Sequence, residues 1–144
     1  MIGQLETGKS GADLDGIGFL RNSLDPCILM SSEGLPLWRN KAFAEILGCR
    51  GRVVDDTPFW DRVHPDDMAS TQQAMAELEA TGVARLHQHR LRCADGTWKW
   101  LEWNATVDNA GRWVCTGRDV THFMNEAANR RVHEAHLAMA SEIG

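Results

Sequence analysis

Two histidines separated by one residue, His87 and His89, are the side chains of this sequence best suited to chemistry. Because side chains alternate along a β-strand, residues two apart lie on the same face. Two neighbouring imidazoles could therefore ligate a metal ion or a haem iron. The pair alone brings no further ligands and no residues that orient it, so the favoured interpretation is two half-exposed histidines hydrogen-bonded within a polar strand. Metal or haem binding through His87 and His89 is the lesser alternative, and no metal ligand is assigned.

The segment His64-Pro65-Asp66-Asp67 also contains residue types that work as acids and bases. Proline at a first helical position and acidic residues in a first turn are typical of a helix start, and Asp67 can bond back towards the cap. These residues and Glu102 form no nucleophile–base–orienter set, and the sequence contains no phosphate-binding glycine loop. We therefore expect a domain that is not itself an enzyme.

Composition narrows the class of protein further. The 144 residues carry a net charge of -5, and the scattered basic residues argue against a nucleic-acid partner. No apolar run reaches the length that crosses a bilayer. Cys27, Cys49, Cys93 and Cys115 lie far apart without a CxxC pair, which indicates free thiols in a reducing compartment. We expect a cytoplasmic protein without a membrane partner.

Hydrophobic periodicity and turn residues predict a mixture of helices and strands. In chain order, the expected elements are a helix over 13–24, strands over 27–30 and 35–39, a helix over 41–47, a short helix over 58–63, a helix from 64–67 to 81, strands over 83–93, 97–107 and 112–120, and a helix over 123–144. Pro36 favours an edge position for its strand. This order predicts an α+β fold: a five-stranded antiparallel sheet with helices on one face, flanked by N- and C-terminal helices.

Four segments, at 37–48, 63–67, 90–103 and 117–121, resemble the landmarks of the PAS family in their order and spacing. The resemblance implies a PAS sensory domain over 19–121, preceded by a tail or short helix over 1–18 and followed by a linker helix over 122–144. It further implies a non-catalytic sensory module of a bacterial signalling protein, such as a histidine kinase or a diguanylate cyclase. The effector domain would then lie in the same, longer chain.

PAS domains commonly bind a small molecule between the sheet and the helices, and strand parity predicts which residues line that space. In PAS relatives the parity of His87 faces the cavity, and this set includes Val83 and Arg85. On the next strand the more apolar face is that of Leu101 and Trp103. The candidate ligand-binding residues are Phe43, Phe59, Met68, Met75, His87, His89, Leu91, Leu101, Trp103, Trp113 and Cys115.

Two functions remain open at this point. The first is a ligand-binding sensor, favoured by the polarity of His87 and His89. The second is a ligand-free dimerisation or spacer module in a tandem sensor array, favoured by the bulk of Trp103 and Trp113. The cofactor is unassigned: haem-binding relatives usually take their iron ligand from the long helix, which contains no histidine here, and flavin is disfavoured because Cys49 lies outside the motif that forms photoadducts.

The resemblance assigns signal relay to Arg118, Asp119 and Thr121, at the junction between sheet and output helix. Asp119 could bond to the backbone or pair with Arg118, or Asp119 or Thr121 could simply cap the helix. A homodimer is the expected partner arrangement, through the flanking helices or the sheet face. The helical seam would be Ala128, Val132, Ala135 and Met139. Trp98 and Trp100 would lie on the sheet face opposite the cavity, where either a second subunit or the N-terminal helix could cover them.

Overall fold

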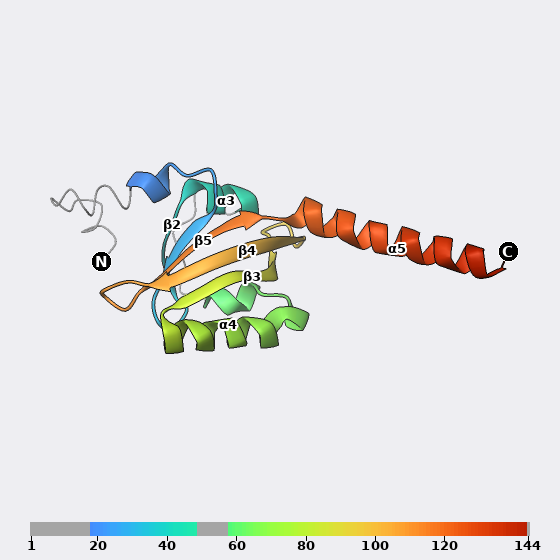
Figure 1. Cartoon of the computed structure of the whole chain (residues 1–144). Helices are drawn as coiled ribbons and strands as arrows, with labels where there is room; N and C mark the ends of the chain where they lie inside the picture. Colours follow the sequence, from blue (N-terminus) through green and yellow to red (C-terminus); the bar gives the residue numbers. More distant parts are fainter. Residues whose placement is uncertain (1–17, 49–57, 144) are drawn as a thin grey trace.

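The computed structural model describes residues 18–48 and 58–143, which form a curved sheet with helices packed on one face (Figure 1). The described elements are β1 (Cys27–Met30), β2 (Pro36–Arg39), α3 (Lys41–Leu47), the 3-10 helices η1 (Phe59–Arg62) and η2 (Pro65–Asp67), α4 (Met68–Thr81), β3 (Val83–Arg92), β4 (Trp98–Val107), β5 (Trp113–Asp119) and α5 (Thr121–Ile143). The five strands pair in the order β2-β1-β5-β4-β3, and every pair is antiparallel. The predicted fold class is confirmed, and β2 with Pro36 lies at an edge.

Asn40 holds the N-terminal half of the domain together. Its side-chain oxygen accepts hydrogen bonds from the N–H of Phe43 at 3.0 Å and the N–H of Cys27 at 2.9 Å. Its amide nitrogen donates to the carbonyls of Leu20 at 2.9 Å and Asp25 at 2.8 Å. Asn40 is thus the N-cap of α3 and also fixes β1 and the segment before it, because all of its side-chain bonding capacity is used in the interior.

The helix predicted over 13–24 is only partly described. Residues 18–21 are helical, Leu24 lies beyond the helix and is exposed, and 13–17 lie outside the described residues. Leu20 packs with Cys27, Leu29 and Trp38 on the outer face of the sheet, opposite the main core. The described part of this helix therefore covers β1 and β2.

The alternation predicted for β3 is wrong in its first half. Ala84 is buried, whereas Arg85 and Leu86 are exposed, so Val83 and Arg85 do not share the inward face of His87 and His89. The pairing register with β4 shifts between Ala84 and His87, and Leu86 adopts a φ of 52°. An extra residue in a bulge reverses the parity of the residues before it, because alternation has a period of two.

The C-terminal helix α5 extends away from the domain as a single long rod (Figure 1). It carries several exposed apolar side chains, which are Phe123, Val132, Leu137 and Met139. None of the helices in the described parts of the chain is both long and apolar enough to span a membrane.

Candidate functional site

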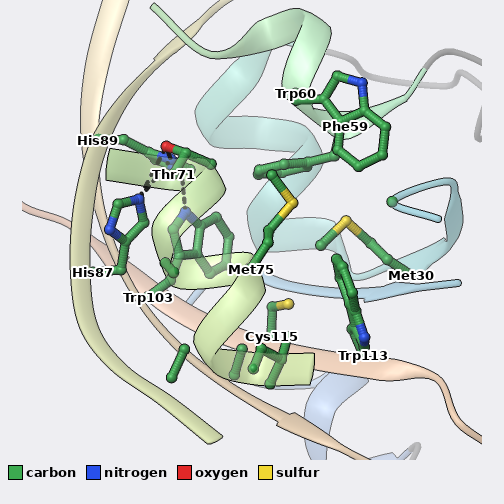
Figure 2. Close-up of a pocket in the computed structure, with 15 residues that line it drawn as sticks. Met30, Phe59, Trp60, Thr71, Met75, His87, His89, Trp103, Trp113 and Cys115 are labelled. Atoms are coloured by element: carbon green, nitrogen blue, oxygen red, sulfur yellow. Dashed lines mark hydrogen bonds between the residues drawn. The ribbon is translucent and has the colours of Figure 1, made fainter. Parts of the chain in front are cut away.

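A cavity of about 60 Å³ lies between the inner face of the sheet and the helical layer (Figure 2). Helix α4, η1 and strands β1, β3, β4 and β5 all contribute to its wall. The lining residues are Met30, Gly34, Phe59, Trp60, Thr71, Ala74, Met75, Leu78, Ala84, His87, His89, Trp103, Ala105, Trp113 and Cys115. The space has the position that the PAS resemblance implied.

The structure brings seven of the eleven candidate ligand-binding residues to this cavity: Phe59, Met75, His87, His89, Trp103, Trp113 and Cys115. The other four, Phe43, Met68, Leu91 and Leu101, pack in or against the core cluster and do not line it. Leu91 pairs with Val63 in an isolated β-bridge, and the ring of Phe43 packs against Trp103 at a centroid distance of 6.2 Å. Facing the helices is therefore not enough to reach the cavity, because core packing fills the rest of that face.

Thr71 is the most informative lining residue that the sequence prediction missed. It lies on α4 with Met75 and Leu78 at spacings of four and seven, which place all three on one helix face. The polar residue at the head of this short apolar stripe was the available signal. Its hydroxyl is buried and donates to the carbonyl of Asp67 at 2.8 Å.

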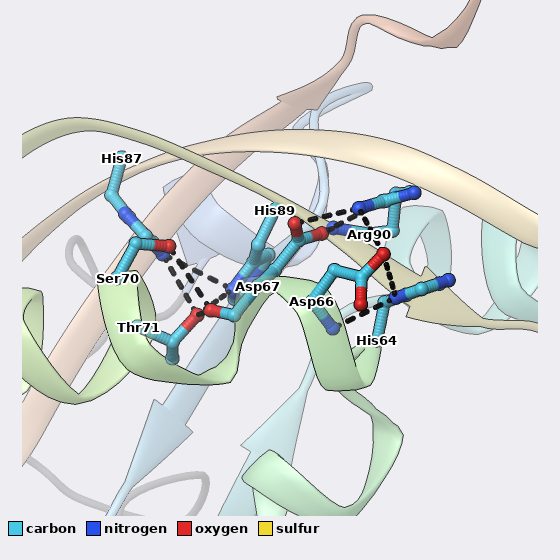
Figure 3. A network of polar contacts seen from close by, with 8 residues as sticks. All are labelled: His64, Asp66, Asp67, Ser70, Thr71, His87, His89 and Arg90. Atoms are coloured by element: carbon cyan, nitrogen blue, oxygen red, sulfur yellow. Dashed lines mark hydrogen bonds and ion pairs between the residues drawn. The ribbon is translucent and has the colours of Figure 1, made fainter.

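Thr71 joins the two histidines and a tryptophan into one hydrogen-bond network (Figures 2 and 3). Thr71 Oγ1 lies 2.9 Å from His89 Nδ1 and 3.0 Å from His87 Nε2, and these two ring nitrogens are 3.2 Å apart. On the far side of His89, the indole N–H of Trp103 donates to Nε2 at 2.9 Å. The two histidines are hydrogen-bonded as expected, but the prediction that both are half-exposed is wrong for His89, which is only 2% exposed because Thr71 and Trp103 bond to both of its ring nitrogens in the interior.

The indole N–H of Trp103 assigns the tautomer of His89. An indole N–H can only donate, so Nε2 of His89 carries a lone pair and the ring proton is on Nδ1. Burial lowers the pKa of His89 to about 3, with a further contribution from His87. Burial also lowers the pKa of His87, and the carboxylate of Asp67 opposes this shift. Both rings are neutral near neutral pH.

This arrangement does not fit a metal or haem iron bound through His87 and His89. The lone pair of His89 that a metal would need already accepts the Trp103 N–H, and both rings face Thr71. Within residues 18–48 and 58–143, no group of three or more His, Cys, Asp or Glu side chains is placed to hold a metal ion. The long helix α4 supplies no histidine.

Asp67 was expected to bond back towards the helix cap, but its carboxylate instead pairs with Arg90 on β3 (Figure 3). The guanidinium donates from Nη2 to Oδ1 at 2.8 Å and from Nε to Oδ2 at 2.9 Å, and the Arg90 backbone N–H donates to Oδ2 at 2.8 Å. The hydrogen bonds from the Arg90 side chain hold the pKa of Asp67 below its ordinary value, against the effect of burial. The guanidinium also lies 4.7 Å above the ring of Trp100 on the outer face.

The junction with α5 is built from Trp100, Asp119 and Thr121. The backbone N–H of Trp100 donates to Thr121 Oγ1 at 2.9 Å, and the Thr121 hydroxyl donates to Asp119 Oδ1 at 2.6 Å. Asp119 also accepts the Thr121 N–H at 2.9 Å, so it caps the helix start. Arg118 pairs across the sheet with Glu102 at 3.0 Å and not with Asp119. Of the three predicted relay residues, two form the connection and Arg118 lies beside it.

The cavity wall touches the strand that leads to this junction. Gly117 pairs with Trp103 across β4 and β5, two residues before Asp119. A Cβ atom at Gly117 would lie 2.5 Å from the Trp103 ring and 2.9 Å from the Glu102 carbonyl oxygen. The indole that lines the cavity therefore rests directly on the backbone of β5, which only a glycine permits at this distance.

The cavity and the strands around it lie largely within the part of the chain that matches a known family. The model of a family described as "PAS fold" matches residues 36–117. Among solved structures, the chain is similar to a domain of a sensory box sensor histidine kinase/response regulator from Geobacter sulfurreducens, with 16% identity over 77% of this chain and 98% of that chain and a TM-score of 0.62. A sensory box histidine kinase/response regulator from Burkholderia thailandensis is 20% identical over 86% of this chain and 95% of that one, with a TM-score of 0.64.

The PAS-B domain of Drosophila melanogaster Cycle, solved with bound ethylene glycol, is 17% identical over 65% of this chain and 98% of that chain, with a TM-score of 0.55. At these identities the three likenesses concern the fold. No curated protein matches the sequence.

Proposed function

This chain belongs to the PAS fold family, whose model matches residues 36–117 of its 144, and we propose that it is a sensory module of a bacterial signalling protein. A small molecule binds in the cavity between sheet and helices, and the signal leaves through α5 to an effector domain in the same chain. The similar domains of sensory box histidine kinases support an output of this kind. The three described cysteines are free and buried, which supports a reducing compartment such as the cytoplasm.

The contact between Trp103 and Gly117 carries this proposal. A ligand that displaces the Trp103 ring must also move β5, because the ring has no free space above Gly117. Two residues further on, Asp119 caps α5 and binds Thr121, which in turn holds the backbone of Trp100 on β4. A shift between β4 and β5 therefore changes the hydrogen bonds that fix the start of α5.

A small-molecule screen followed by hydrogen exchange tests this function. Trp60, Trp103 and Trp113 line the cavity, so tryptophan fluorescence reports a bound molecule. We expect a hit to change amide exchange over residues 121–124 by about tenfold, since that is the effect of a free-energy change of about 1.4 kcal/mol in local opening.

In Thr121→Val the hit should still bind but leave amide exchange unchanged, because the Trp100–Thr121–Asp119 connection is lost. Thr106→Val, at an exposed threonine of β4 that takes no part in this connection, is the control and should behave as wild type. A bound molecule that leaves this turn unaffected in the wild type would exclude the proposed relay.

A ligand-free dimerisation module is the second candidate, and two observations favour it. The cavity of about 60 Å³ is small beside ligand pockets of roughly 300–1,000 Å³. In addition, Val132 and Met139, both on the seam predicted from the sequence, are more than half exposed on α5. A second copy packed along α5 would bury this stripe.

Sedimentation equilibrium distinguishes this arrangement. The 16.1 kDa chain is expected to sediment as a species of twice that mass, and Val132→Lys to shift it to the monomer because a buried lysine would lose its hydration. Glu134→Lys, at a neighbouring exposed position off the seam, serves as control and should leave the mass unchanged. A monomeric wild-type protein at high micromolar concentration would contradict dimerisation through α5.

A further inference from the structure

The polar atoms of the cavity are gathered in one corner, formed by Thr71, His87, His89 and Trp103 (Figure 2). Elsewhere the wall presents carbon and sulfur, including the thioethers of Met30 and Met75 and the thiol of Cys115. Burial raises the pKa of that thiol to about 12, so it is uncharged. Figure 2 also shows the rings of Trp60 and Trp113 with their nitrogen atoms on the side away from Met75. What a ligand can bond to therefore depends on the polar corner.

A series of hydrogen bonds runs through this corner, and each donor in it is already bonded to a protein acceptor. The Trp103 N–H donates to His89 Nε2, which leaves the His89 proton on Nδ1, 2.9 Å from Thr71 Oγ1. The Thr71 hydroxyl proton is donated to the Asp67 carbonyl at 2.8 Å, so Oγ1 accepts from His89. The chain runs in one direction, Trp103 to His89 to Thr71 to Asp67, and ends on backbone.

His87 does not offer a ligand in the cavity a hydrogen-bonding group either. Its Nε2 lies within 3.0 Å of Thr71 Oγ1 and 3.2 Å of His89 Nδ1, inside the same corner. The other ring nitrogen points away from the remaining lining residues in Figure 2. His87 also lines a separate surface groove between α4 and β3, with Ser70, Gln73 and Gln88, and this groove can hydrate that nitrogen.

A cavity lined in this way is unfavourable for water. A buried water typically needs two to four polar partners, whereas an apolar cavity of about 150 Å³, larger than this one, stays dry and binds xenon or benzene. A polar ligand would lose its hydration without gaining hydrogen bonds in return.

We propose that the cavity selects small, uncharged, apolar molecules, and that the closed Trp103–His89–Thr71 hydrogen-bond chain is what excludes water and polar ligands. This inference rests on the proposed ligand-sensing function and specifies its ligand class. This hydrogen-bond chain determines specificity: His89 lies in the cavity wall, but both of its ring nitrogens are bonded to Trp103 and Thr71 and cannot bond to a ligand.

The test compares xenon with ethylene glycol as probes in the full chain. With ¹³C-labelled methionine methyl groups, xenon pressure should shift the Met30 and Met75 signals saturably, and ethylene glycol should leave them unchanged. Trp103→Phe removes the indole N–H and leaves the lone pair of His89 Nε2 open to the cavity. In this variant we expect the affinity for ethylene glycol to rise about tenfold, the effect of one hydrogen bond gained.

Trp113→Phe is the matched control, because it enlarges the same cavity without opening a histidine nitrogen. It should strengthen xenon binding and leave ethylene glycol unbound. If Trp103→Phe does not fold, Thr71→Val takes its place, since it removes the acceptor of His89 Nδ1–H with little change of shape.

The comparison of the two probes in the wild-type protein decides the proposal in either case. Saturable binding of ethylene glycol to the wild type, without xenon binding, would refute the apolar ligand class and leave ligand sensing intact. Binding of neither probe would refute both.

Discussion

Replacing Gly117 with alanine is expected to destabilise the protein by about 3 kcal/mol, the upper part of the range for overpacking a core. The added Cβ would lie 2.5 Å from the Trp103 ring and 2.9 Å from the backbone oxygen of Glu102. The backbone oxygen cannot move without breaking the pairing of β4 and β5, so the indole must yield. Moving the indole also weakens its hydrogen bond to His89, which leaves a buried nitrogen without its donor.

Thermal unfolding measures this effect, and we expect a melting temperature lower by on the order of 10 °C. Gly18→Ala is the control: no atom lies within 4 Å of its added Cβ, and alanine favours the helix there. Equal melting temperatures for Gly117→Ala and wild type would mean that Trp103 does not rest on β5. The proposed route from the cavity to α5 would then lose its first step.

The stability of the fold should fall as the pH is lowered from 6.5 to 4.5. His89 has a folded pKa of about 3, below its unfolded value of 6.5, and the pKa of His87 is also lowered. The unfolded chain therefore binds more protons than the folded one below pH 6.5, so the stabilising contribution is complete above this pH and is lost as the pH falls. One such group costs about 1.4 kcal/mol per pH unit, which gives about 2–3 kcal/mol over this interval for His89 alone.

The histidine effect is separable from that of the carboxylates. The carboxylates with lowered pKa values lose their stabilising contribution only as the pH falls through and below their unfolded values of 3.8–4.5; they are Asp67, Asp95, Glu102 and Asp108. Urea unfolding at pH 7.5, 6.5, 5.5 and 4.5 therefore isolates the two rings. His89→Leu should reduce the slope of stability against pH by about one proton, and His136→Gln on the exposed part of α5 should not change it. An unaltered slope in His89→Leu would mean that His89 is not held neutral by burial.

Local chemistry made most of the fold predictable. The turns after Met30, Arg92 and Val107 contain glycines with positive φ at positions 34, 96 and 111, where such residues favour reversal of the chain. Asn40 and Gly48 bound α3 as expected from capping preferences. Each of these signals lies within a few residues of the structure that it determines.

The candidate site was less predictable, because contacts between distant residues shape it. The bulge at Arg85 and Leu86 reverses which face the first residues of β3 point to, and neither residue type is one that favours a bulge. Asp67 binds Arg90, 23 residues away, and does not bond back towards the helix cap, because a bidentate charged pair outweighs one capping bond. The link from Trp103 to His89 depends on the register of β3 with β4, which alternation alone does not fix.

These distant contacts place a rigid hydrogen-bond network directly beside an empty volume, as the proposed relay requires. The polar corner fixes His89 by hydrogen bonds on both ring nitrogens, while the cavity beside it provides empty volume. Packed interiors transmit displacement because they have few such voids. The empty volume adjoins Trp103, whose ring rests on Gly117 of β5, and the proposed relay to the start of α5 begins at this contact.

A double-mutant cycle between cavity and junction tests the central claim most directly. Ala105→Val fills part of the cavity from β4, Thr121→Val breaks the connection at α5, and the two are combined in a third variant. Hydrogen exchange of residues 121–124 gives the free energy of local opening in all four proteins. We predict a coupling energy of about 1 kcal/mol between the two substitutions, whereas effects that add within about 0.5 kcal/mol would contradict communication between the cavity and α5.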